Sequence, residues 1–177
     1  GLKQQQEKPG FIAKKTFYQS IYGEHPYAHL VAGDTESLKQ IQLSDIKQFY
    51  QQYYVTKNAV LAIVGDLTEQ QVRQIAETLF KQLKQGGKAE ELPKVSLPKT
   101  FKKEHIDFPS TQTHILAGMP VLSRKDPDYF PLYVGNHILG GSGLVSLLFN
   151  EIREKRGLAY SAYSYFSPLE EAGPFTM

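Results

Sequence analysis

The sequence predicts an α+β fold, with helices packed on a sheet and the chain divided into two parts. Three observations predict it: amphipathic helical patterns recur along the chain, short β-branched or alternating runs lie between them, and a polar stretch with two prolines, residues 91–99, separates two structured regions. Hydrophobic residues make up 41% of the 177 residues, which is enough apolar material for a core.

The first part, residues 1–90, contains the stronger helical signals. Thr68 and Gln71 have the spacing of a capping box, and Gly86-Gly87 would end the helix that this box begins. In chain order we expect a helix at 10–21, a loop at 22–34, a short turn from Thr35, a helix from Ser44, a buried strand at 58–66 and a helix from Thr68.

The second part, residues 100–177, contains more strand-like sequence. We expect strands at 100–108, 111–121 and 158–166, a helix that begins at Asp126-Pro127, and a second helix at 144–156 that Gly157 caps. The apolar stripe of the first of these helices comprises Phe130, Tyr133, Val134, His137 and Ile138, so the sequence predicts that this face is buried and that His137 is partly buried.

Composition excludes several classes of function. The absence of cysteine excludes disulfides, thiolate zinc sites and cysteine nucleophiles. The net charge is +2 with no basic stripe, so nucleic acid is not an expected partner. No apolar run approaches the roughly 20 residues of a membrane span. Because the first residue is Gly1 and the last residues resemble the start of a strand, we expect a piece of a longer protein.

The segment YGEHPYAH places His25 and His29 four residues apart, the spacing at which two imidazoles on one helical turn can bind zinc. Gly23, Pro26 and Gly33 leave little room for a helix, and the other three histidines are scattered. A zinc site needs at least three protein ligands. The sequence therefore favours a tight polar loop over a zinc site, and predicts no metal ligands.

Two further segments allow a structural and a functional interpretation. The glycines of 140–143 lack the lysine of a phosphate-binding loop, so a close-packed turn is the simpler interpretation. Arg153 lies near a predicted helix end, where cations are ordinary partners of the helix dipole. It also lies near Tyr160, and the two side chains could together donate hydrogen bonds to a carbonyl oxygen that gains charge. Composition leaves both interpretations of this pair open.

Three stretches are similar, in order and spacing, to an insulinase/pitrilysin-like zinc metallopeptidase family. They are YGEHPYAHLVAGDTESLKQI, DIKQFYQQYYVTKNAVLAIVGDL and ILGGSGLVSLLFNEIREKRGLAYS. The family carries an inverted H-x-x-E-H motif and includes mitochondrial processing peptidase. This chain resembles the family's C-terminal inactive domain region and lacks that motif. The resemblance implies that residues 1–90 are the back half of one insulinase-like domain, 91–99 a linker, and 100–177 the front half of the next.

The resemblance also implies a function. The chain would be a fragment of a zinc-dependent endopeptidase or processing protease, with the zinc bound elsewhere in the parent and no catalytic residue here. Arg153 and Tyr160 would contact substrate, and Gly140, Gly141 and Gly143 would lie in a substrate-handling loop. The alternative is a non-catalytic structural or peptide-binding homologue or partner subunit.

The partners that the resemblance implies are a peptide or unfolded protein substrate and a second insulinase-like half or subunit. The sequence does not fix the compartment, and the resemblance to bacterial members favours a periplasmic or secreted location. By itself the chain is expected not to hydrolyse peptides.

Overall fold

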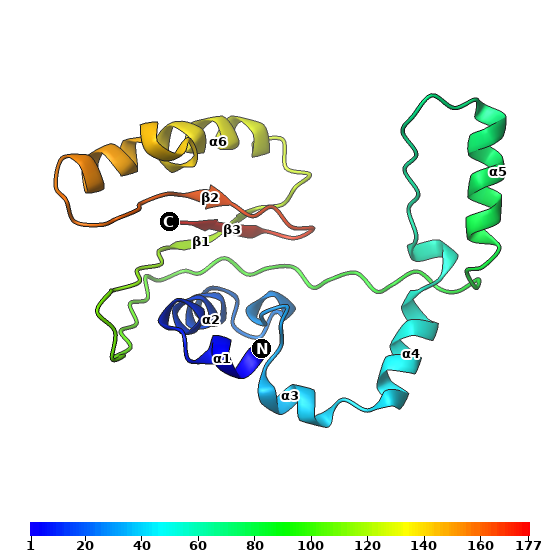
Figure 1. Ribbon diagram of the computed structural model, residues 1–177, viewed down its shortest axis with the longest axis horizontal. Coiled ribbons are helices and arrows are strands. Elements are labelled where there is room, and N and C mark those ends of the chain that lie inside the picture. The colour runs from blue at the N-terminus through cyan, green and yellow to red at the C-terminus, as the bar shows by residue number, and fades with distance from the viewer. The chain divides into compact units, whose positions relative to one another are not determined.

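In the computed structural model, which describes residues 1–177, three strands form one antiparallel sheet with the order β1-β3-β2. The strands are β1 (Gly118–Leu122), β2 (Tyr165–Phe166) and β3 (Gly173–Thr176) (Figure 1). They belong to a compact unit made of residues 1–35 and 92–177, and residues 36–91 form a second unit. The structure confirms the α+β class, while the predicted domain boundary at 91–99 stays a prediction.

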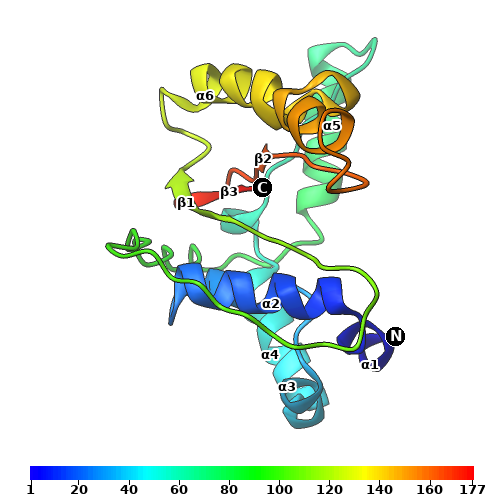
Figure 2. The same ribbon diagram turned by 90° about the vertical axis from the view of Figure 1, so that its left-hand side faces the viewer.

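Helices lie on both faces of this sheet. The helices α1 (Leu2–Gln6) and α2 (Pro9–Tyr22) lie on one side, and α6 (Tyr129–Asn136) lies on the other (Figures 1 and 2). The central strand β3 pairs with β1 in a register that places Pro120 opposite Pro174 and Leu122 opposite Gly173. One extra residue on β1 between these pairs makes a bulge, which bends the strand.

The chain after α6 changes its helical geometry three times. A π-helical turn, η3 (His137–Gly141), is followed by a 3₁₀ turn, η4 (Gly143–Val145), and a second π-helical stretch, η5 (Phe149–Glu154). The predicted continuous helix at 144–156 is therefore wrong in its first third. The predicted cap is confirmed, because Gly157 has a φ of 62° and its N–H donates to the Arg153 carbonyl oxygen at 2.9 Å.

The side of α6 that faces the sheet is not the predicted one. Tyr129 and Asn136 are buried, whereas Phe130, Val134 and Ile138 are 68%, 62% and 59% exposed. His137, predicted to be partly buried, is exposed as well. The predicted stripe follows apolar side chains alone. The buried side of the helix instead carries Asn136, whose amide forms hydrogen bonds with the chain just before β2, as described below.

The second unit contains α3 (Thr35–Gln40), which begins at its boundary, α4 (Leu43–Tyr53), η2 (Thr56–Asn58) and α5 (Glu69–Phe80). The predicted capping box is confirmed: Thr68 N–H donates to Gln71 Oε1 at 2.8 Å, and Gln71 N–H donates to Thr68 Oγ1 at 3.4 Å. Asn58 links the end of α4 to the chain after α5, because its amide donates to the Tyr53 carbonyl oxygen and accepts from the Ala89 N–H.

Most of the predicted strand sequence forms no strand. The predicted strand at 58–66 is wrong, and Val60 and Val64 are 96% and 98% exposed. Residues 100–108 form none, and the other two predicted strands shrink to Gly118–Leu122 and Tyr165–Phe166. A strand is defined by hydrogen bonds to a partner. Apolar alternation indicates a tendency to extend but says nothing about whether a partner is present.

Candidate functional site

Both π-helical stretches carry residues that the sequence singled out. In η3, which contains Gly140 and Gly141, the Ser142 N–H donates to the His137 carbonyl oxygen at 3.0 Å. In η5, which contains Arg153, the Lys155 N–H donates to the Asn150 carbonyl oxygen at 2.9 Å. These are bonds between residues five apart. Such π-helical insertions in helices are rare and occur frequently at functional sites.

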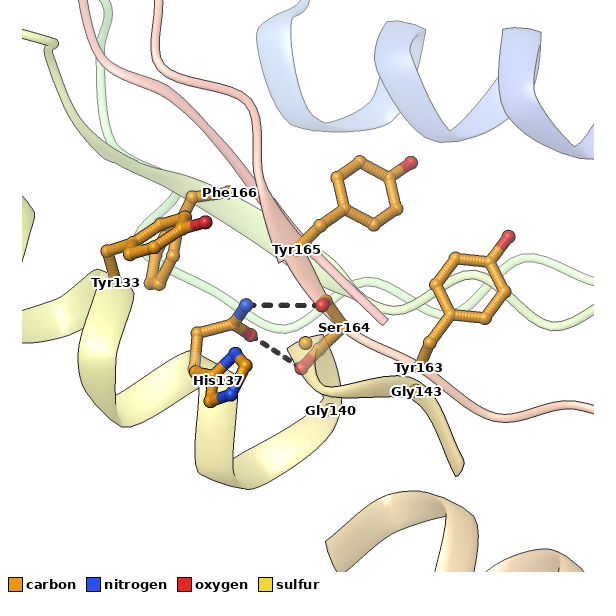
Figure 3. A pocket seen from close by; sticks show the side chains of 10 residues that line it. Tyr133, His137, Gly140, Gly143, Tyr163, Ser164, Tyr165 and Phe166 are labelled. Atoms are coloured by element: carbon orange, nitrogen blue, oxygen red, sulfur yellow. Dashed lines mark hydrogen bonds between the residues drawn. The ribbon is translucent and has the colours of Figure 1, made fainter. Parts of the chain in front are cut away.

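A cavity of about 290 Å³ lies beside the glycine segment. Its lining combines the backbone of Gly140, Gly141 and Gly143 with side chains from α6 and from residues 163–166 (Figure 3). Four aromatic rings contribute, those of Tyr133, Tyr163, Tyr165 and Phe166, together with His137. The three predicted glycines therefore share one cavity whose other walls are mainly aromatic.

Two buried polar residues at this cavity were not singled out from the sequence. Ser164 Oγ donates to Asn136 Oδ1 at 2.6 Å, and Asn136 Nδ2 donates to the Ser164 carbonyl oxygen at 3.2 Å (Figure 3). Asn136 is 7% exposed and Ser164 is 1% exposed. The available signal was an asparagine inside an otherwise apolar helix, because a buried amide must find hydrogen-bond partners.

Arg153 and Tyr160 lie against each other, as their spacing around the helix end suggested. The guanidinium carbon of Arg153 lies 4.8 Å from the centroid of the Tyr160 ring and 4.8 Å from that of Phe149. Tyr160 is 83% exposed, whereas Phe149 is buried. A guanidinium over a ring face interacts with the π electrons, and its N–H groups can still donate to a carbonyl oxygen. Phe149, which orients the arginine, was not identified from the sequence.

Charges of both signs surround Arg153. Glu154 Oε1 lies 3.8 Å from Arg153 Nε, a loose contact at the surface. Lys155 Nζ donates a hydrogen bond to Glu151, and this bond with the neighbouring positive charge lowers the pKa of the Glu151 carboxyl. Lys155 thus pairs with Glu151, and Arg153 has only the loose contact with Glu154.

The five predicted substrate-binding residues fall into two places. Gly140, Gly141 and Gly143 line the 290 Å³ cavity, whereas Arg153 and Tyr160 do not. The structure therefore brings the arginine together with the tyrosine, and the glycines with one another, but does not gather all five in one cavity.

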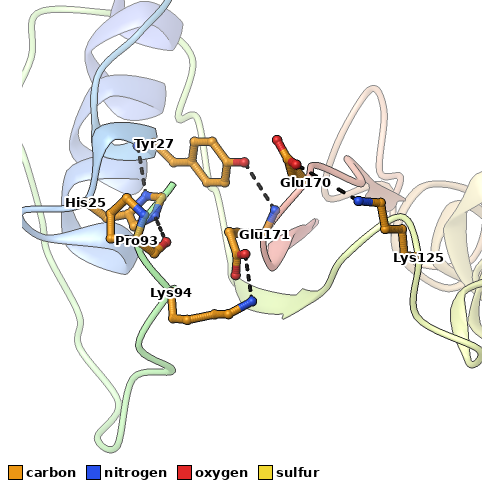
Figure 4. Close-up of polar contacts among 7 residues, drawn as sticks. All are labelled: His25, Tyr27, Pro93, Lys94, Lys125, Glu170 and Glu171. Carbon is orange, nitrogen blue, oxygen red and sulfur yellow. Dashed lines mark hydrogen bonds and ion pairs between the residues drawn. The ribbon is translucent and has the colours of Figure 1, made fainter. Parts of the chain in front are cut away.

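The segment with zinc-like spacing is a tight loop held by hydrogen bonds. His25 Nδ1 accepts from the Tyr27 N–H at 3.1 Å, and His25 Nε2 lies 2.8 Å from the Pro93 carbonyl oxygen (Figure 4). Because a carbonyl only accepts, Nε2 carries the proton and the ring is neutral. Pro26–Ala28 form a 3₁₀ turn, so the two histidines do not share an α-helical face. No group of three His, Asp or Glu residues in the chain could hold a metal ion.

We expect this chain to bind zinc weakly and without fixed stoichiometry, because both nitrogens of His25 are engaged and no ligand set surrounds it. Isothermal calorimetry of the wild type and of His25→Ala should give the same weak heats. A tight one-to-one zinc complex that His25→Ala abolishes would overturn the loop interpretation.

Tyrosines of this loop join it to the turn before β3. Tyr22 Oη donates to the Ala172 carbonyl oxygen at 3.1 Å, and the Glu171 N–H donates to Tyr27 Oη at 3.3 Å. Lys94 Nζ pairs with Glu171 at 2.9 Å (Figure 4). Burial, together with the nearby Tyr18 and Tyr27, raises the pKa of the Tyr22 phenol. The loop therefore has a structural role, because it connects α2 to the turn before β3 within the unit formed by residues 1–35 and 92–177.

This raised pKa predicts a loss of stability at alkaline pH. The unfolded chain releases the Tyr22 proton near pH 10 while the folded chain retains it, so the free energy of unfolding falls as pH rises above 10. Tyr22→Phe should flatten this dependence and cost about 1 kcal/mol at pH 7 through the lost bond to Ala172. Urea unfolding from pH 7 to 11 measures both effects, and equal alkaline slopes in the two proteins would contradict the assignment.

The sequence and the fold of this chain have counterparts among known proteins. Residues 40–177 match the family described as the peptidase M16 inactive domain. An uncharacterized zinc protease of Streptomyces coelicolor is 30% identical over 178 residues, which cover 96% of this chain and 38% of that protein. An uncharacterized zinc protease of Bacillus subtilis is 29% identical over 178 residues, or 99% of this chain and 42% of that protein.

Solved structures with a similar fold are also known. The crystal structure of a peptidase M16 inactive domain from Pseudomonas fluorescens is 39% identical with a TM-score of 0.94, and the match covers 99% of this chain and 42% of that one. A chain from complex III2 of Candida albicans, 18% identical with a TM-score of 0.74 over 99% of this chain and 43% of that one, shares the fold.

The chain spans about two fifths of the length of the relatives that it matches. No helix in it combines the length and the apolar character that crossing a membrane requires. The relatives are zinc proteases, and the family match runs through the cavity, the π-helical stretches and the sheet. This chain belongs to the peptidase M16 family and corresponds to its inactive domain.

Proposed function

We propose that this chain is the part of a zinc-dependent endopeptidase or processing protease that forms chamber wall and contacts the peptide substrate. The observation that carries the proposal is that the Arg153 guanidinium lies over the rings of Phe149 and Tyr160, at 4.8 Å from each ring centroid. The zinc-protease names of the relatives support the reaction class. The zinc itself would be bound by residues outside this chain, which has no ligand set.

The chemistry we assign to Arg153 and Tyr160 is hydrogen-bond donation to a peptide carbonyl. A guanidinium that lies over two aromatic rings is restricted in its movement, and its N–H groups can bind a carbonyl oxygen. The exposed Tyr160 hydroxyl adds a second donor. Such donors orient a peptide and stabilise the oxygen as it gains negative charge during hydrolysis.

The glycine segment is the second proposed contact. Gly140, Gly141 and Gly143 present backbone to a cavity of about 290 Å³ with aromatic walls. Backbone without side chains allows an extended peptide to approach closely. We propose that a peptide or unfolded polypeptide passes over this segment as well as over Arg153 and Tyr160.

We also propose that residues 1–90 and 100–177 are halves of two insulinase-like domains joined by the linker 91–99. The whole protein would complete each domain and pair it with a second half or subunit. Two observations support this arrangement. The chain spans about two fifths of its relatives, and apolar side chains of two helices are exposed: Ile46, Phe49 and Tyr50 of α4, and Phe130 and Val134 of α6. An exposed apolar face of this kind is typical of a surface that another element covers.

The experiment that tests the proposed function is steady-state peptide hydrolysis by the whole protein, or by its complex with a subunit that carries H-x-x-E-H. Arg153→Ala should lower turnover while the protein remains folded. Unchanged turnover would leave the alternative, a non-catalytic structural or peptide-binding homologue of such a peptidase.

A further inference from the structure

The buried pair Asn136–Ser164 joins the end of α6 to the chain just before β2. The orientation of the Asn136 amide is determined by its partners: Oδ1 accepts from the Ser164 hydroxyl and Nδ2 donates to the Ser164 carbonyl. A flipped amide would place two oxygens against each other. The Ser164 N–H adds a third bond, to the Gly140 carbonyl oxygen at 3.3 Å.

The glycines of η3 are packed directly against this pair. A Cβ on Gly140 would fall on the hydroxyl and the backbone nitrogen of Ser164, and a Cβ on Gly141 would lie 2.8 Å from Asn136 Nδ2. Neither glycine has a positive φ. Close approach to Asn136 and Ser164, rather than conformational freedom, therefore requires glycine at both positions.

The pair also lies next to a backbone geometry that needs support. The bond from the Ser142 N–H to the His137 carbonyl oxygen closes a π-helical turn directly after α6. Without other contacts a helix favours bonds between residues four apart. A return to α-helical bonding would rotate every following residue by about 100° and turn the glycine backbone away from the cavity.

We infer that Asn136 and Ser164 are positioning residues that hold the π-helical turn, and so keep the backbone of Gly140 and Gly141 facing the cavity as a peptide-binding surface. The part of this inference that concerns peptide rests on the proposed function. The part that concerns the turn rests on hydrogen bonds and burial alone.

Asn136→Asp is the sharpest test, because the side chain keeps its shape and changes only its ability to donate. The ionised carboxylate of this variant cannot donate to the Ser164 carbonyl and repels it, whereas the protonated acid can both donate and accept as the amide does. Burial raises the pKa of this carboxyl, so the protonated form prevails at pH 4 and the ionised fraction increases toward pH 8. The π-helical turn should therefore lose its support at pH 8 and regain it at pH 4.

Two measurements on each protein separate positioning from general destabilisation. Hydrogen exchange should show the Ser142 amide losing about tenfold or more of its protection in Asn136→Asp at pH 8, the cost of a buried unpaired group, with recovery at pH 4. The Ser167 and Met177 amides, which are bonded within the sheet, should keep theirs. Anisotropy of fluorescein-labelled β-casein measures polypeptide binding, which should weaken about tenfold in parallel.

Wild-type protein at each pH is the control for other titrating groups. His137, Tyr133, Tyr163 and Tyr165 line the same cavity, and the ratio of variant to wild type removes their contribution. Ser164→Ala removes the hydroxyl that donates to Asn136 Oδ1 and introduces no acid, so its loss of Ser142 protection should be the same at both pH values.

Unchanged Ser142 protection, or an equal loss at Ser142, Ser167 and Met177, would overturn the inference. If the Ser142 amide alone loses protection and the affinity for β-casein is unchanged, the pair positions the turn but the turn does not bind peptide. That result would also overturn the glycine contact of the proposed function. An absence of β-casein binding in the wild type would have the same meaning.

Discussion

Replacing Arg153 with alanine is expected to lower turnover of the intact peptidase by roughly 10- to 1000-fold, the usual cost of removing a donor that stabilises a developing oxyanion. The side chain is held 4.8 Å from the rings of Phe149 and Tyr160, so its N–H edge is already oriented. Such an interaction strengthens as charge develops, so kcat should fall more than KM rises.

Tyr160→Phe separates the two roles of the tyrosine. The substitution keeps the ring against which Arg153 stacks and removes only the exposed hydroxyl. If the hydroxyl donates to substrate, turnover should fall within the same range of roughly 10- to 1000-fold. If the ring only supports Arg153, Tyr160→Phe should leave turnover unchanged while Tyr160→Ala lowers it.

Arg156→Ala is the matched control for Arg153→Ala. Arg156 lies three residues after Arg153, carries the same charge, is exposed and stacks on no ring. A general loss of positive charge would affect Arg153→Ala and Arg156→Ala alike, whereas a specific contact affects only the variants at 153 and 160. Full turnover in both Arg153→Ala and Tyr160→Phe would mean that the motif is structural.

The parts of the fold that the sequence predicted correctly are those set by neighbouring residues. The capping box of Thr68 and Gln71 and the glycine cap at Gly157 each act within one helical turn, and both are present. Helix α2 follows from its local pattern in the same way. The run 58–66 failed because a strand needs a partner that no local pattern specifies.

In the candidate site, too, contacts between residues near in sequence could be predicted and contacts between distant residues could not. Arg153 and Tyr160 are seven residues apart across a helix end, so their proximity could be anticipated. Asn136 and Ser164 are separated by 28 residues, and their bonds join the buried side of α6 to the chain just before β2. Hydrophobic patterning gave the wrong side, because it weighs apolar area and ignores the requirement of a buried amide for partners.

Replacing Gly140 with alanine is expected to lower the free energy of unfolding by about 3 kcal/mol, combining overpacking with the loss of a buried hydrogen bond. The added Cβ would fall on Ser164, which cannot withdraw because its hydroxyl and carbonyl are bonded to Asn136. The chain must then either break these bonds or move α6 away from the sheet.

Gly135→Ala is the control, on the last turn of α6 just before η3. A Cβ at Gly135 meets nothing within 4 Å, and alanine is the better helix former, so this variant should be equal to wild type or up to about 1 kcal/mol more stable. Urea unfolding at pH 7 compares the three proteins. A Gly140→Ala protein as stable as Gly135→Ala would show that the glycine turn is free to move away from Ser164, and that close packing is not the reason for glycine at position 140.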